Sequence, residues 1–405
     1  MFRMNFARPL GLVLLFALLL ASTTGCGPAE SSAATLWRGT MDTLASGTVV
    51  VSNPAEGVWS EETAWSVIEE IRIGTLEGDG PDMFGNVGSL EVDDQGRIYV
   101  YDTHANELRV FGPTGEHVRT IGRQGGGPGE FESVIGMAWG PEGRLWLIDP
   151  GNARISLFDS TGTYLTSHRT IGNIIISPWP GGFDRAGSFY NYGIDTEADP
   201  EDRMVLVRYD ESMEPADTIR LPRREGEGEF FTLRSENSMM QSTVPFTGGF
   251  SWRFVPQPQI WFANLSEYRI YQRALAGDTV RVISRDYSHL PVTEADIEAA
   301  VERLDWFTRQ GGKIDRSRFP STKPALNTFF SDADGRMWVS PVTSEADRGR
   351  VWDVFDPDGR YLGQIVLPFV LERYPTPLFR NGMIYGVTED ELEVPYVVRA
   401  RIETP

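Results

Sequence analysis

The sequence predicts an all-β fold, because one hairpin unit recurs along most of the chain. The unit is a strand, a turn that usually contains glycine, and a second strand in which apolar and polar residues alternate. Copies at residues 92–102 and 138–149 place their turn glycines 47 positions apart, and copies at residues 331–339 and 381–387 have the same spacing. Short antiparallel strands repeated at such intervals are typical of β-propeller blades.

Six units can be counted when two degenerate copies, at residues 185–191 and 257–262, are included. The turns lie at positions 96, 143, 187, 258, 335 and 382, so the steps are 47, 44, 71, 77 and 47 residues. A second turn in the unit, such as the one at Gly115, indicates about four strands per unit. We therefore predict a six-bladed β-propeller with four-stranded antiparallel blades and one helical insertion between blades 4 and 5.

The ring is expected to close with a strand from the N-terminal part of the chain. The last unit is cut short at Ile402. The stretches Thr48 to Ser52 and Trp65 to Gly74 have the composition of strands. Pairing one of them with the last unit would leave no open edge at the seam. The predicted propeller domain therefore covers residues 46–405.

The helical insertion, at about residues 285–323, is predicted from a helix start and an apolar stripe. Thr293 and Asp296 have the spacing of a capping box. The stripe consists of Ile297, Ala300, Val301, Leu304 and Phe307. It is expected to pack on its own domain, and the alternative is a partner-binding or lid element.

Residues 1–25 are typical of an export signal. Arg3 and Arg8 precede an uncharged apolar run from Leu10 to Ala21, which covers about 18 Å as a helix and is too short to span a bilayer. Small residues then lead to Cys26, the only cysteine of the chain. The segment resembles the lipobox of bacterial lipoproteins, which implies lipidation of Cys26. The alternative is an ordinary cleaved signal with an incidental cysteine.

The charge balance excludes some partners. The formal charge is −20, and −22 without the first 25 residues, so the surface repels nucleic acid and anionic headgroups. We expect no nucleic-acid partner and membrane contact through the lipid anchor only, with residues 26–45 as a flexible tether. The expected form is a monomer in the bacterial cell envelope, on the outer membrane or the periplasmic side in a cell with two membranes.

Three segments carry a family resemblance. Residues 101–111 and 148–155, which contain the sequences Tyr-Asp-Thr-His-Ala-Asn and Ile-Asp-Pro-Gly-Asn-Ala, resemble the core of NHL repeats. Residues 127–131, Gly-Pro-Gly-Glu-Phe, resemble the linker between such repeats. As a whole the chain is similar to TolB-like six-bladed propellers found as bacterial exported proteins. The resemblance implies binding of protein or RNA, and the charge argues against RNA.

The candidate binding face consists of the loops that follow the second strands, where propellers usually bind. The candidate residues there are His104, Asn106, Asn152, Asp195, Glu197 and Asp199. His104 could instead be a solvated loop histidine. Asp102 and Asp149 end their second strands and are expected to hold the turns by accepting bonds from backbone N–H groups, which is a structural role.

No catalytic residue is predicted. The four histidines lack zinc-ligand spacing, and no serine lies in a Gly-x-Ser-x-Gly elbow. The glycine-rich run at residues 125–129 lacks the end of a P-loop and is predicted to be a turn between blades. Acidic residues of several loops could bind Ca²⁺, or could form a solvated surface. No cofactor is expected, with Ca²⁺ as the alternative.

Three functions follow from these observations. The first is a binding module for a protein, peptide or glycan at the cell envelope. The second comes from a resemblance to the gluconolactonase group of propellers, which implies a divalent cation in the channel that activates a lactone or ester for hydrolysis. The third, a resemblance to peptidylglycine-lyase-like NHL propellers, implies zinc, for which the chain has few histidines. Binding is expected more than catalysis.

Overall fold

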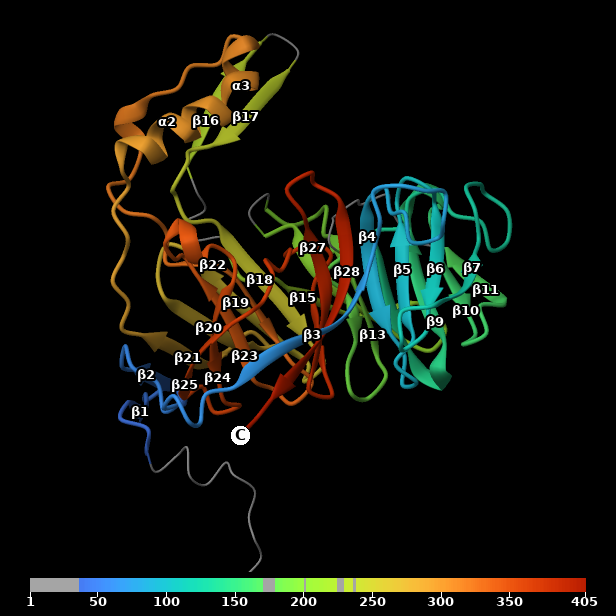
Figure 1. The fold of residues 1–405 in the computed structure, drawn as a ribbon, viewed down its shortest axis with the longest axis horizontal. Coiled ribbons are helices and arrows are strands. Elements are labelled where there is room, and N and C mark those ends of the chain that lie inside the picture. The colour runs from blue at the N-terminus through green and yellow to red at the C-terminus, as the bar shows by residue number, and fades with distance from the viewer. Residues whose placement is uncertain (1–35, 170–178, 200–201, 224–228, 236–237) are drawn as a thin grey trace, which may run out of the picture. The chain divides into compact units, whose positions relative to one another are not determined.

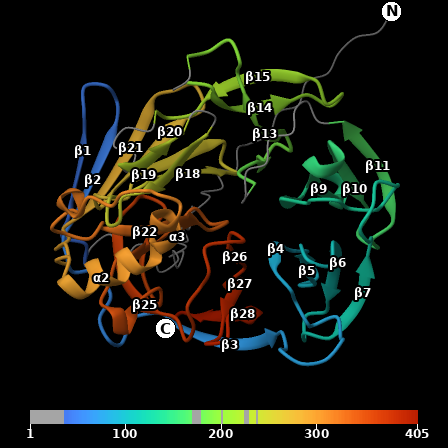
Figure 2. The ribbon, with the colours of Figure 1, turned by 90° about the horizontal axis from the view of Figure 1, so that it is seen from above.

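The structure is a computed structural model that describes residues 36–169, 179–199, 202–223, 229–235 and 238–405. In the described part of the unit Trp37–Pro405, six sheets of at least four strands surround a central axis (Figures 1 and 2). The first strand of each sheet lies nearest the axis, and the later strands follow outward (Figure 2). The predicted six-bladed β-propeller is confirmed.

Blades 1 to 3 each consist of four consecutive antiparallel strands. Blade 1 contains β4 (Val87–Val92), β5 (Ile98–Asp102), β6 (Glu107–Phe111) and β7 (His117–Ile121). Blade 2 contains β8 (Gly136–Trp139), β9 (Leu145–Asp149), β10 (Arg154–Phe158) and β11 (Tyr164–Arg169). Blade 3 contains β12 (Gly182–Phe183), β13 (Phe189–Ile194), β14 (Met204–Tyr209) and β15 (Pro215–Arg220).

Blades 4 to 6 follow the same pattern, with strands added from the N-terminal region. Blade 4 contains β18 (Phe250–Val255), β19 (Gln259–Asn264), β20 (Arg269–Ala274) and β21 (Thr279–Arg285), extended by β2 (Val49–Asn53) and β1 (Thr40–Thr43). Blade 5 contains β22 (Leu326–Ser331), β23 (Met337–Pro341), β24 (Val351–Phe355) and β25 (Tyr361–Val366). Blade 6 contains β26 (Leu378–Arg380), β27 (Met383–Glu389), β28 (Pro395–Glu403) and β3 (Ser66–Ile73).

The N-terminal strand β3 closes the ring, as predicted. It is the outer strand of blade 6 and pairs antiparallel with β28, from Ser66 opposite Glu403 to Ile73 opposite Val397. Strand β2 instead runs parallel to β21 on the outer edge of blade 4. Strand β1 then pairs with β2, so the stretch predicted as a tether, residues 26–45, includes a strand of this sheet.

The recurrent hairpin turn has a common local cause. All six predicted turn positions lie between the first and second strands of successive blades. In blade 1, the Asp93 carboxylate accepts the N–H groups of residues 95 and 97 at 2.9 Å, and Gly96 has a φ of +77°. Asp332 and Gly335 repeat this arrangement in blade 5, where φ is +87°. The aspartate supplies the turn's acceptor, and glycine adopts the left-handed backbone without strain.

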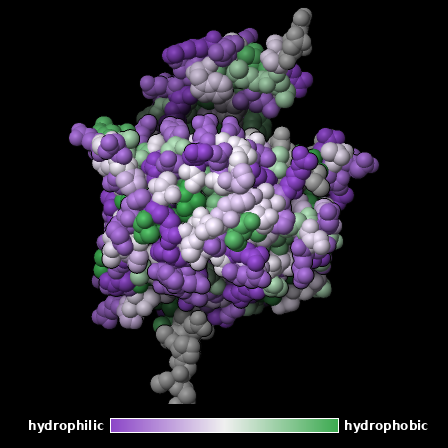
Figure 3. Space-filling model, turned by 90° about the vertical axis from the view of Figure 1, so that its right-hand side faces the viewer, coloured by the Kyte–Doolittle hydropathy of each residue, from purple (hydrophilic) through white to green (hydrophobic). Residues whose placement is uncertain are grey.

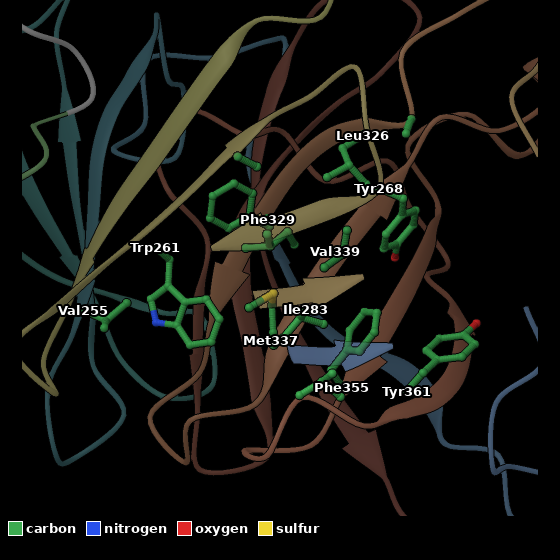
Figure 4. Close-up of a cluster of buried hydrophobic side chains, with 14 residues drawn as sticks. Val255, Trp261, Tyr268, Ile283, Leu326, Phe329, Met337, Val339, Phe355 and Tyr361 are labelled. Atoms are coloured by element: carbon green, nitrogen blue, oxygen red, sulfur yellow. The ribbon is translucent and has the colours of Figure 1, made fainter. Parts of the chain in front are cut away.

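The apolar residues pack between neighbouring blades. Figure 4 shows one such cluster, in which Trp261 and Ile283 of blade 4 lie beside Phe329, Met337 and Phe355 of blade 5. Strand residues alternate between the two faces of a sheet, so each blade contributes apolar side chains to both of its neighbours. The outer side turned toward the viewer in Figure 3 is mostly hydrophilic, with scattered hydrophobic residues.

Two insertions form a projection that we call the cap, composed of β16 (Phe230–Arg234), β17 (Met239–Thr243), α2 (Glu294–Arg303) and α3 (Asp305–Arg309) (Figure 1). The helices lie between blades 4 and 5, as predicted, and Thr293 and Asp296 form the capping box. Leu304 and Phe307 are buried against Phe231 of β16 and nearby Val244. The helical stripe therefore packs within its own domain, on the other insertion.

Short 3-10 helices occur at η1 (Pro141–Gly143), η2 (Pro150–Asn152), η3 (Arg316–Arg318) and η4 (Glu345–Asp347). Within the described residues, no helix has the length and apolar character that crossing a membrane requires.

Candidate functional site

The first strands of the blades line a channel on the axis of the ring. The channel contains a cavity of about 350 Å³, a size typical of small-ligand sites. Its wall comes from β4, β8 and β18 and from the segments that precede β12 and β26, so five blades contribute. The lining residues lie where the first strands begin, toward the face that carries the connections between blades and the loops between second and third strands. We call this the loop face.

Aromatic side chains form much of the cavity wall. Trp252 of β18 lies against Tyr192 of β13, with the ring centroids 6.4 Å apart. The indole nitrogen of Trp179 donates a hydrogen bond to the side-chain oxygen of Asn191 at 2.7 Å. Tyr374, in the segment before β26, is 49% exposed. Rings of this kind offer broad apolar faces together with polar groups that can bind a ligand.

Glu91 of β4 is one of two charged residues on the described wall. Burial raises the pKa of its carboxyl group to about 8, although the N–H of Val92 and the positive charge of Arg380 act in the opposite direction. A carboxyl group with this pKa is mostly protonated at pH 7. Glu91 therefore adds little negative charge to the channel at neutral pH.

Arg253 of β18 is the other charged residue on the described wall. Its Nη1 donates to the carbonyl of Trp252 at 2.8 Å, and its Nη2 donates to the Thr328 hydroxyl at 3.3 Å. The guanidinium lies over the ring of Phe330, 5.2 Å from the centroid. Burial lowers the pKa of Arg253 from its usual value, but an arginine still remains charged at neutral pH.

The predicted residues of blades 1 and 2 lie on the loop face. Two of them, Asn106 and Asn152, make side-chain hydrogen bonds within the fold. The Asn106 side-chain oxygen accepts the Tyr101 hydroxyl at 2.8 Å. The Asn152 amide donates to the Gly125 carbonyl and to the Asp149 carboxylate, at 2.9 and 2.8 Å. His104 is exposed, and its ring packs against the backbone of Gly85. None of these three residues lines the cavity as described.

Asp102 and Asp149 have the expected bonding. Asp102 accepts backbone N–H groups from residues 85, 86, 104 and 105, at 2.9 to 3.4 Å. Asp149 accepts those of residues 132, 133 and 152, at 2.9 to 3.3 Å. Both carboxylates are buried and join the linker before a blade to the loop after its second strand. The bonding supports the predicted structural role.

The glycine-rich run between β7 and β8 is a turn between blades, as predicted. Its carbonyls at Gly126 and Gly127 accept the Arg154 guanidinium at 3.0 and 2.7 Å. A phosphate cradle would instead require several N–H groups directed toward the anion.

The acidic residues of blade 3 lie in the loop between β13 and β14. The Asp195 carboxylate accepts the N–H of Glu197 at 3.1 Å and lies 3.6 Å from Arg220, while Glu197 and Asp199 are exposed. In the other described loops, Glu345 pairs with Arg348, and Asp390 caps its own turn. Among the residues that the structure describes, no three His, Cys, Asp or Glu side chains gather as a metal site.

Two predictions fall outside the described residues. They are the export signal at residues 1–25 and the lipidation of Cys26. The channel residues Glu91 and Arg253 were not predicted. Their signal in the sequence is a single charge within an otherwise largely apolar first strand, in Ser-Leu-Glu-Val and in Phe-Ser-Trp-Arg-Phe-Val.

Comparison with known proteins agrees with this geometry. Residues 55–174 match the family DUF5128, described as "6-bladed beta-propeller". The chain is a six-bladed β-propeller. No curated protein matches the sequence. The resemblance to NHL repeats and TolB-like propellers stays a prediction.

Three solved structures resemble this chain at low sequence identity. A protein of Bacteroides fragilis described as exported is 11% identical with a TM-score of 0.50, and the match covers 88% of this chain and 100% of that one. A DUF4221 member from Bacteroides vulgatus is 10% identical, with a TM-score of 0.49 and coverages of 85% and 100%. Virginiamycin B lyase from Staphylococcus aureus is 10% identical, with a TM-score of 0.44 and coverages of 84% and 99%. At these identities the likeness concerns the fold alone.

Proposed function

We propose that this propeller is an exported, lipid-anchored binding module that takes part of a protein, peptide or glycan into its channel from the loop face. The observation that carries the proposal is the cavity of about 350 Å³ with its aromatic wall. A cavity that combines aromatic faces with polar groups can bind a ligand, and a propeller channel is a frequent place for such a site.

The donor groups of the channel do not favour the hydrolase alternative. A divalent cation such as Ca²⁺ takes six to eight oxygen ligands, with several from carboxylates. The described wall supplies one carboxyl group, Glu91, whose pKa of about 8 favours its neutral form, and one cation, Arg253. The described residues therefore do not fit a metal-dependent reaction in this cavity, whereas they do fit reversible binding.

Thermal melting of the full chain against panels of envelope glycans and peptides tests the proposal. A compound that binds the native state at a hundredfold excess over its Kd should raise the Tm by about 3 °C. The variant Tyr374→Ala should reduce that shift, because it removes part of the channel mouth. Trp306→Ala is the matched control, since this cap residue is also 49% exposed, and it should leave the shift unchanged.

Two outcomes of the melting experiment would contradict the binding function. One is that no compound of either panel raises the Tm of the unmodified chain. The other is that the compound raises the Tm of Tyr374→Ala and of Trp306→Ala by the same amount, because the compound would then bind outside the channel.

A further inference from the structure

Arg253 differs from Arg109 and Arg285, two other arginines whose side chains are mostly buried in the propeller. Arg109 lies 3.2 Å from the Asp102 carboxylate, and Arg285 lies 2.9 Å from that of Asp353. Arg253 has only a carbonyl and a hydroxyl as hydrogen-bond partners among the described residues, and its Nε is buried without a partner. A buried guanidinium that lacks a counter-charge is destabilising unless an anion reaches it.

The position of Arg253 on its strand explains how an anion could reach it. The neighbouring residues Trp252 and Phe254 face blade 3, where Phe254 lies 4.7 Å from the ring of Tyr190. Arg253 therefore points the opposite way, toward Phe330 and Thr328 of blade 5, and it is also among the residues that line the channel cavity. Arginine has five N–H donors, and the described contacts of Arg253 use two.

The charge of the channel is opposite to that of the protein. The chain has a formal charge of −20. The charged residues on the described wall are Arg253 and Glu91, and the carboxyl group of Glu91 is mostly neutral at pH 7. One positive charge on the wall suits a singly charged anion, and a second cation, Arg373, stacks on Tyr374 without lining the cavity. A carboxylate also matches the fork of N–H donors on a guanidinium.

We propose that the channel binds a ligand through a carboxylate group that pairs with Arg253, while the rest of the ligand lies against the aromatic wall at Trp252 and Tyr374. This inference rests on the proposed binding function and adds the chemical class of the ligand. An acidic sugar and the C-terminus of a peptide both present such a carboxylate.

Calorimetric titration of the full chain at pH 7 with two matched pairs of probes tests the inference. The sugar pair is glucuronic acid and glucose, and the peptide pair is N-acetyl-phenylalanine and its amide. We expect at least one acid to bind at least about tenfold more tightly than its neutral counterpart, because a hydrogen bond to a charged group contributes about one such factor or more. The pair that shows the preference identifies the source of the carboxylate.

Three variants assign the preference to the channel. Arg253→Gln should abolish the difference between acid and neutral probe, and Arg253→Lys should keep part of it, because the charge remains while the planar fork is lost. Arg269→Gln is the control, since this arginine is half-exposed on β20 of the same blade and pairs with Glu267. It should leave the preference unchanged.

The results separate this inference from the function on which it rests. If a panel compound binds in a manner sensitive to Tyr374→Ala but Arg253→Gln binds the acids as tightly as the unmodified chain, the binding function stands and the carboxylate class is wrong. If neither acid binds more tightly than its neutral counterpart, the carboxylate class is also wrong.

Discussion

Replacing Asp353 with alanine is expected to lower the free energy of unfolding by about 3–5 kcal/mol, because it leaves a buried arginine without its counter-charge. Asp353 lies on β24 and is 0% exposed. Its carboxylate accepts the Tyr268 hydroxyl at 2.5 Å, the Tyr361 hydroxyl at 2.8 Å and the Arg285 guanidinium at 2.9 Å. Denaturant unfolding, with the slope compared between variants, measures the loss.

The Asp353 network joins two blades and the N-terminal segment. Arg285 ends β21 of blade 4, stacks 4.3 Å from the ring centroid of Tyr361, and donates to the carbonyl of Ala55 at 2.8 Å. Burial, followed by the charge of Asp353, raises the pKa of both Tyr268 and Tyr361, so their hydroxyl groups remain donors. Removing the carboxylate therefore leaves three donors at this blade interface without this acceptor. Figure 4 labels two of them, Tyr268 and Tyr361.

Asp358→Ala is the control for Asp353→Ala. This aspartate lies in the turn before β25, is 54% exposed and pairs with Arg360 at 2.9 Å. An exposed pair contributes about 0–1 kcal/mol. Equal losses for the two variants would show that the buried network does not hold blades 4 and 5 together.

Replacing Cys26 with serine is expected to move the protein from the membrane fraction to the soluble fraction. Serine lacks the thiol that the lipobox resemblance identifies as the acylated group. The chain has no other cysteine. Expression of the full chain in a bacterium that acylates lipoproteins, followed by ultracentrifugation and labelling with a radioactive fatty acid, measures both location and acylation.

Thr24→Ser is the matched control for the anchor, because it changes a neighbouring small residue and leaves the thiol in place. This variant should sediment with membranes and carry the label. A Cys26→Ser protein that still sediments with membranes would show that another attachment holds the chain, and the lipid anchor would then be wrong.

The fold could be predicted because its causes are local and repeated. A turn such as that at Gly96 or Gly335 needs a glycine at one position, and the flanking strands need alternating residues. Six copies then imply six sheets, even where an insertion separates two copies. The closing strand β3 could be predicted because the last unit has too few residues for a fourth strand.

The candidate site could not be predicted in the same way, because the channel depends on residues far apart in the sequence. Glu91 and Arg253 lie 162 positions apart and line one cavity only when the first strands converge on one axis. The repeat predicts that His104 and Asn152 lie on the same face of the propeller. The Asn152 amide, however, makes hydrogen bonds to nearby groups of its own fold and does not line the cavity. The cap was missed as a unit because its two insertions are separated by all of blade 4.

Every statement about the channel depends on the ring being closed. A designed disulfide between β3 and β28 tests this closure most directly. Ser66 and Glu403 are paired across the two strands, so in a Cys26→Ser background the double variant Ser66→Cys with Glu403→Cys should oxidise within one chain. In the control, Ser66→Cys with Arg399→Cys, the partner position lies opposite Ile71, roughly 17 Å along the strand. Mass spectrometry after mild oxidation should find the bond in the first variant and not in the control. Its absence from the first variant, or equal oxidation of both, would contradict the closed ring.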